Sequence, residues 1–167
     1  MNRTKKISML GLFIAIAFIF SYIESLFPLP IPFPGIKLGL ANLIIVFVLY
    51  TDGLASAFAV SLLRNLLNAL TFGNLFGLFY SLAGSILSLL IMWLLKSRLS
   101  TVSVSAIGGI VHNLGQFLVA VALVGHDAIL YYLPFLYFAG LIAGILMGIL
   151  TQLCLTKLPV HFLKQQF

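Results

Sequence analysis

Six apolar segments follow one another along the chain with only short connections between them. A helix needs roughly 20 apolar residues to cross a bilayer, so a chain of this length has room for about six such helices and little else. Only 7% of the residues are charged, which is too few to cover a water-soluble globule. We therefore predict an all-α polytopic membrane protein with six transmembrane helices in a single domain over 1–167. The expected spans lie near residues 7–27, 38–50, 54–72, 76–95, 101–124 and 130–155.

The second span is short for a full crossing, so we expect it to be tilted, to thin the bilayer locally or to include part of the preceding loop. That loop has prolines at alternate positions from Pro28 to Pro34. Alternating prolines make a stiff, extended segment without helix. The segment is either a lid over the outer face or a rigid connector.

The basic residues are distributed unevenly between the two sides that a six-helix topology defines. The side of the termini carries Arg3, Lys5, Lys6, Lys96, Arg98, Lys157 and Lys164. The opposite side carries only Lys37. Because cytoplasmic loops are enriched in Lys and Arg, we predict a protein of the cell membrane with both termini in the cytoplasm. The net charge of +6 is thus explained by topology, and we expect no nucleic-acid partner.

Arg64 lies deep inside the third span, with Asn68 one turn further along the same face. Ionisable side chains within a bilayer are costly and mark functional sites. Arg64 therefore needs an acidic partner, a polar cavity or an anionic ligand. Glu24, at the end of the first span, is the candidate for an internal ion pair.

A second polar face lies on the fifth span, where His112 and Gln116 are four residues apart and Asn113 is beside them. His112 and Arg64 lie at similar depth, so we predict one cavity between the two helices, open toward the outside. The alternative for His112 is a packing role. Three residues at the outer ends of the first two spans either rim this cavity or serve as interfacial anchors: Glu24, Lys37 and Asn42.

The sequence lacks the groups that most enzymes need. Its three carboxylates, Glu24, Asp52 and Asp127, are not paired at one place, so neither acid–base chemistry nor a Mg²⁺ site is expected. A phosphate-binding GxxxxGKS loop is missing. Cys154 is the single cysteine, and no His or Cys accompanies it at metal-ligand spacing. We predict no catalytic residue, no metal and no cofactor, and we do not expect a self-sufficient enzyme.

Small residues recur at helical spacing on several spans, and such ridges let helix backbones approach closely. Gly140, Gly144 and Gly148 form one ridge on the last span, and Gly11 and Ala15 form another on the first. Each ridge either packs within the monomer or docks against a separate membrane protein.

Four blocks of the sequence resemble the Gx transporter family, also named heptaprenyl diphosphate synthase component I. They are 34–43, Arg64, 81–84 and 108–116, and the resemblance extends over about residues 7–155. That family is similar to the S components of energy-coupling factor transporters. The resemblance implies six helices that capture a vitamin-like molecule from outside, together with a membrane coupling subunit and two ATPases. It also implies docking to that subunit through Gly11 and Ala15, with Gly11 in place of the first Ala of the family's motif.

Three functions follow from these observations. In the first, the chain is the substrate-binding subunit of an energy-coupling factor-like uptake transporter. In the second, it is a non-catalytic subunit that assists heptaprenyl diphosphate or quinone synthesis through a groove open to lipid. In the third, it is a structural scaffold in which Arg64 and Glu24 pair and leave no cavity. For the first function, the expected substrate-binding residues are Arg64, Asn68, His112, Asn113 and Gln116, with Glu24, Lys37 and Asn42 at the rim.

Overall fold

The computed structural model describes residues 3–26, 38–124 and 127–158, and within these ranges it contains helices and no strand. The helices are α1 (Arg3–Leu26), α2 (Leu40–Thr51), α3 (Leu54–Thr71), α4 (Leu75–Leu95), α5 (Thr101–Val124), the 3₁₀-helix η1 (Asp127–Tyr132) and α6 (Leu133–Lys157). Five of the described α-helices are long and apolar enough to cross a membrane. The prediction of an all-α polytopic membrane protein is therefore confirmed. Lys37 and the proline-rich segment 28–35 lie outside the described residues.

Local sequence signals explain where several helices begin. The side chain of Asn74 accepts a hydrogen bond of 2.7 Å from the Gly77 N–H and so caps the first turn of α4. Gly39 and Gly53 precede α2 and α3 with φ of 80° and 93°. Residues with a Cβ rarely adopt these angles, so glycine permits the sharp entry into each helix. A proline in the first turn of α6 occupies a position where its missing N–H has no consequence.

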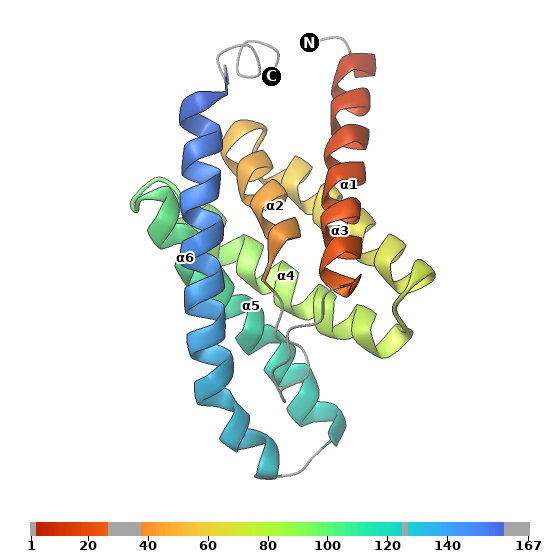
Figure 1. Ribbon diagram of the computed structural model, residues 1–167, viewed down its shortest axis with the longest axis vertical. Helices are drawn as coiled ribbons and strands as arrows, with labels where there is room; N and C mark the ends of the chain where they lie inside the picture. The colour runs from red at the N-terminus through yellow and green to blue at the C-terminus, as the bar shows by residue number, and fades with distance from the viewer. Residues whose placement is uncertain (1–2, 27–37, 125–126, 159–167) are drawn as a thin grey trace.

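The short helix α2 forms the centre of the apolar core. Its 12 residues extend over about 18 Å, which is less than the thickness of a bilayer. It packs between α1 and α6 and also contacts α3 (Figure 1). Every side chain from Ile44 to Leu49 is buried, against residues that include Phe13, Val60 and Leu89. A helix surrounded in this way needs no polar face, which explains why the second apolar segment is both short and apolar on all sides.

Close backbone contacts join α5 to α4 and α6. A Cβ built on Gly109 would collide with the carbonyl oxygen of Gly140, and one on Gly144 would lie 2.7 Å from the Cα of Ala106. On the other side of α5, a Cβ on Gly115 would lie 2.8 Å from the Cα of Gly84. The ridge of Gly140, Gly144 and Gly148 therefore packs within the chain, as the first of the two interpretations proposed.

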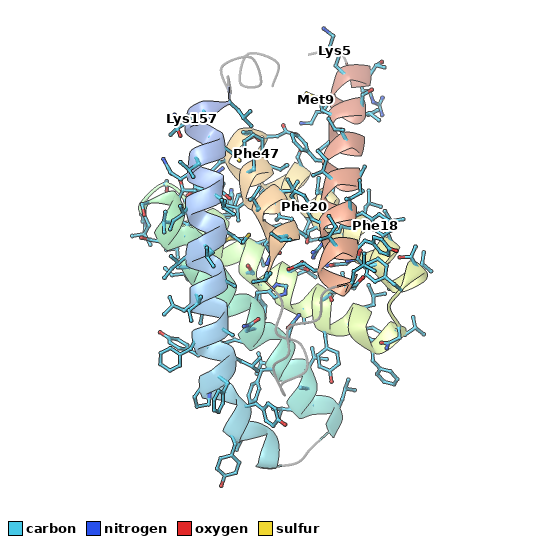
Figure 2. The ribbon with its side chains drawn as sticks, in the orientation of Figure 1. Lys5, Met9, Phe18, Phe20, Phe47 and Lys157 are labelled. Carbon is cyan, nitrogen blue, oxygen red and sulfur yellow. The ribbon has the colours of Figure 1, made fainter. Side chains whose placement is uncertain are left out.

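One end of the bundle gathers basic side chains. Figure 2 shows Lys5, in the first turns of α1, and Lys157, at the end of α6, at the same end of the molecule. Lys6 forms a 3.0 Å ion pair with Asp52, which follows α2. Lys96, after α4, donates a 3.2 Å hydrogen bond to the carbonyl oxygen of Leu49. The start of α1 and the ends of α2, α4 and α6 thus meet at this end.

Candidate functional site

A polar cavity lies within the bundle, and all six α-helices contribute to its walls. The centre of a water molecule fits in about 80 Å³ of it. This is room for several waters, because each needs roughly 10–15 Å³ by this measure. Amide and hydroxyl side chains, together with the glycines of the α5–α6 contact, form most of the described lining. The cavity can therefore hold a small polar molecule.

Seven of the eight residues predicted to bind substrate line this one cavity. They are Glu24, Asn42, Arg64, Asn68, His112, Asn113 and Gln116. The eighth, Lys37, lies outside the described residues. Helical spacing explains the result, because Arg64 and Asn68 share a face of α3 while His112 and Gln116 share a face of α5. That these side chains bind a substrate remains a prediction.

Arg64 lies buried in the cavity wall with 8% of its surface exposed. Its Nη1 donates to Ser21 Oγ at 3.3 Å, and its Nη2 donates to Asn65 Oδ1 at 2.7 Å. Its Nε has no hydrogen-bond partner within the described part of the chain. The partners on the guanidinium are thus neutral oxygens.

The ion pair between Arg64 and Glu24, one of the alternatives for Arg64, does not form within 4.0 Å. Across residues 3–26, 38–124 and 127–158, the ion pair within 4.0 Å is that of Lys6 and Asp52. The scaffold function required Arg64 and Glu24 to pair and to leave no cavity, and both requirements are contradicted. The charge of Arg64 is held in the cavity wall without a directly contacting carboxylate.

Glu24 is instead engaged by the start of α2. Its Oε1 accepts hydrogen bonds from the backbone N–H groups of Gly39, at 2.5 Å, and Leu40, at 3.1 Å. The first N–H groups of a helix have no partner within the helix and carry partial positive charge, so a carboxylate stabilises them. The sequence analysis missed this role. The available signal was the absence of a Ser, Thr, Asn or Asp cap before α2.

A hydrogen-bonded network of hydroxyl and amide groups holds the side chain of Arg64 in position. Asn65 accepts from Arg64 and donates through Nδ2 to Ser85 Oγ at 2.9 Å, while Ser21 donates to the Ala17 carbonyl oxygen at 3.0 Å. Sequence reasoning did not select Ser21 or Ser85. The serines of α4, Ser81, Ser85 and Ser88, recur at helical spacing in an apolar span, and this pattern was the signal that marked them.

The α5 wall carries the second group of polar side chains. Gln116 Nε2 and His112 Nε2 lie 3.2 Å apart, and Asn113 Nδ2 donates to the carbonyl oxygen of Leu136 at 2.7 Å. Gly84 of α4 lies directly behind them, since a Cβ there would be 2.6 Å from the His112 carbonyl oxygen and 3.0 Å from Gln116 Cγ. The close contact of α4 with α5 therefore fixes the position of this wall.

The predicted docking residues Gly11 and Ala15 are exposed on α1. A Cβ built on Gly11 meets nothing within 4 Å. The surface at Gly11 is thus not covered by the described part of the chain, whereas the glycine ridge on α6 packs against α5. Its use for docking stays a prediction.

The family model described as heptaprenyl diphosphate synthase component I matches residues 13–154. The chain belongs to this family. For this heptaprenyl diphosphate synthase component I family member, no curated protein and no solved structure gives a significant match. The matched range includes every described residue that lines the cavity.

Proposed function

We propose that this family member is the substrate-binding membrane subunit of an energy-coupling factor-like uptake system for a small molecule. The observation that carries the proposal is the single cavity that joins Arg64 on α3 to His112 and Gln116 on α5. Ionisable side chains within a membrane mark functional sites. Arg64 is such a side chain, and its hydrogen-bond partners Ser21 and Asn65 are neutral. A cavity with convergent polar groups is the usual form of a small-molecule site.

The proposed binding mechanism assigns a separate task to each wall. Arg64 supplies a fixed positive charge with several donors in one plane. Asn65 and Ser21 hold its guanidinium, so the charge is in place before a ligand arrives. Asn68, Asn113 and Gln116 supply directional hydrogen bonds that select among ligands. These contacts bind and orient a molecule and include no chemical step.

The proposed direction of capture is from outside the cell. The basic end of the bundle would face the cytoplasm, because cytoplasmic ends are enriched in Lys and Arg. The end of α1 and the start of α2, which lie away from the basic end, contribute Glu24, Gly39 and Asn42 to the cavity lining. In this orientation both termini are cytoplasmic and a ligand enters from the outer face. A membrane coupling subunit at Gly11 and Ala15, and ATPases on other chains, would supply the energy.

The family's description favours a second candidate, a non-catalytic role in heptaprenyl diphosphate or quinone synthesis. This role calls for a soluble prenyl synthase as partner and for a surface that holds a long apolar chain. Most of the described cavity lining is instead amide, hydroxyl and glycine residues. The polar lining favours the uptake function.

The test is native mass spectrometry of the full-length protein in lipid nanodiscs after incubation with a small-molecule extract of cells. We expect an added mass on the natural chain and its loss in Arg64→Gln. Arg98→Gln, an exposed cation outside the cavity, is the matched control and should keep the added mass.

Two outcomes contradict the uptake proposal. One is an added mass of equal occupancy on the natural chain and on Arg64→Gln. The other is a retained polyprenyl species together with a co-purified soluble prenyl synthase, which would establish the second candidate.

A further inference from the structure

We infer that the cavity takes a small zwitterion, a molecule with one anionic group and one cationic group such as a carboxylate and an amine. This inference rests on the proposed function, because it names the chemical class of the substrate for the same site. It differs from the expectation of a diphosphate that the family's description raises.

The first argument is the sign of the charges on the described walls. Among the described lining residues, Arg64 is the arginine and Glu24 is the carboxylic acid, so their formal charges are opposite. His112 adds a group that is neutral or positive depending on its protonation state. The described lining therefore offers one cationic and one anionic anchor.

The second argument is the spacing of these two anchors. The guanidinium of Arg64 contacts Ser21, and Ser21 lies one turn before Glu24 on the same face of α1. Side chains spaced in this way have Cβ atoms about 5–6 Å apart. The two charges are thus neighbours on one wall and still form no ion pair within 4.0 Å. A short molecule that carries both signs can contact the two at once.

The third argument concerns the hydrogen bonds that hold the side chains of Arg64 and Glu24 in separate positions. Asn65 and Ser21 hold Arg64 through two of its five N–H donors. Backbone N–H groups of Gly39 and Leu40 hold Glu24 through Oε1 alone. Both hydrogen bonds that Glu24 accepts from the described residues go to Oε1. Each charge is therefore fixed by neutral groups and keeps unused hydrogen-bonding capacity.

A diphosphate fits these walls poorly. It brings two or more negative charges and mainly acceptor oxygens, and a pocket beside Glu24 would place like charges close together. The amides of Asn42, Asn68, Asn113 and Gln116 each offer both a donor and an acceptor. Such a set suits a ligand with both N–H donors and carboxylate acceptors and with no net charge.

The experiment is a calorimetric titration of the full-length protein in nanodiscs with small-molecule probes. The probes are the twenty proteinogenic amino acids, β-alanine and γ-aminobutyrate, with inorganic diphosphate as the competing class. We expect at least one zwitterion to bind at least tenfold more tightly than diphosphate. Its N-acetyl derivative, which lacks the cation, and its methyl ester, which lacks the anion, should each bind at least tenfold more weakly.

Two variants assign the charges to the residues. Glu24→Gln keeps an oxygen for the N–H groups of Gly39 and Leu40, so the start of α2 stays held. It should weaken the zwitterion at least tenfold and leave the N-acetyl derivative unchanged. Arg64→Gln should weaken the zwitterion and leave the methyl ester unchanged. Arg98→Gln should bind every probe as the natural chain does.

The inference is overturned if diphosphate binds more tightly than every zwitterion, if no zwitterion binds, or if Glu24→Gln leaves zwitterion affinity intact. The proposed function is judged separately by the mass spectrometry of extract-treated protein. A retained molecule of another class there would preserve the uptake role and reject the zwitterion alone.

Discussion

Two regions of the bundle, the apolar core around α2 and the polar cavity, are built in opposite ways. At the basic end, the C-terminal part of α2 is enclosed by apolar side chains, and Val48 and Leu49 have no exposed surface. Around the cavity, the walls carry Arg64 and several amides. Buried polar groups destabilise a fold unless they are hydrogen-bonded, and burial of the apolar side chains of α2 offsets this cost. We therefore expect that substitutions can change stability and ligand binding separately, and four predictions test this expectation.

Leu49→Ala should have the largest effect on stability. Leu49 is fully buried in the core cluster, and truncating a buried leucine costs about 2–5 kcal/mol through lost contacts and the cavity left behind. Thermal unfolding in nanodiscs, followed by tryptophan fluorescence, measures the change. An unchanged unfolding temperature would show that the apolar core does not carry the stability of the fold.

Arg64→Gln should weaken ligand binding without lowering stability, which is the reverse of the effect expected for a core substitution. Loss of a buried charged contact to a ligand typically costs about 2–5 kcal/mol of binding free energy, or about 30-fold or more in affinity. The unfolding temperature should stay equal or rise, because an incompletely partnered buried charge is removed. Paired calorimetry and thermal unfolding measure both quantities. A large loss of stability with intact affinity would make Arg64 a structural residue.

Gly84→Ala should affect both halves of the comparison. The new Cβ would lie 2.6 Å from the carbonyl oxygen of His112, so α4 and α5 must separate, at about 1–3 kcal/mol. The same shift displaces His112 and Gln116, and ligand affinity should fall with stability. The matched control is Gly11→Ala, where nothing lies within 4 Å and helix propensity predicts a gain of up to ~1 kcal/mol. Equal behaviour of the two variants would contradict the close α4–α5 contact.

Gly11→Leu should have the smallest effect on stability, a gain of up to about 1 kcal/mol as for Gly11→Ala, because the position is open and Leu is also a good helix former. Ligand binding by the isolated protein should also be unchanged, since Gly11 lies outside the described cavity lining. If α1 docks against a coupling subunit, cellular uptake should fall while binding persists. Uptake and binding measured on the same variant separate these two expectations, and unchanged uptake would remove Gly11 from the docking surface.

The sequence predicted the helices well because apolar length is a strong signal. The expected spans 54–72, 76–95 and 101–124 agree closely with α3, α4 and α5. α1 begins earlier than its apolar residues do, at Arg3, because the basic first turn is also helical. α2 begins at Leu40, after Gly39 in a left-handed conformation. Hydropathy does not report these ends, which depend on backbone geometry.

The cavity was predictable to the extent that helical spacing and depth locate side chains. Arg64, Asn68, His112 and Gln116 could be matched in height from position alone, without contacts. The partners that hold them could not. Glu24 reaches Gly39 across 15 residues, and Asn65 reaches Ser85 across 20. Such pairs depend on how neighbouring helices are rotated, which one sequence does not encode in a readable pattern.

The short central helix is attached at both of its ends to the same neighbour. Glu24 of α1 holds the N–H groups at the start of α2, and Lys6 of α1 pairs with Asp52 just after its end. Close glycine contacts hold α4, α5 and α6 together as a second unit. We expect α1 and α2 to move as one rigid unit relative to these three helices. Opening of the cavity would then be a sliding of one unit past the other. A cysteine crosslink between α1 and α2 should leave ligand exchange unhindered, whereas one between α2 and α6 should trap or exclude the ligand.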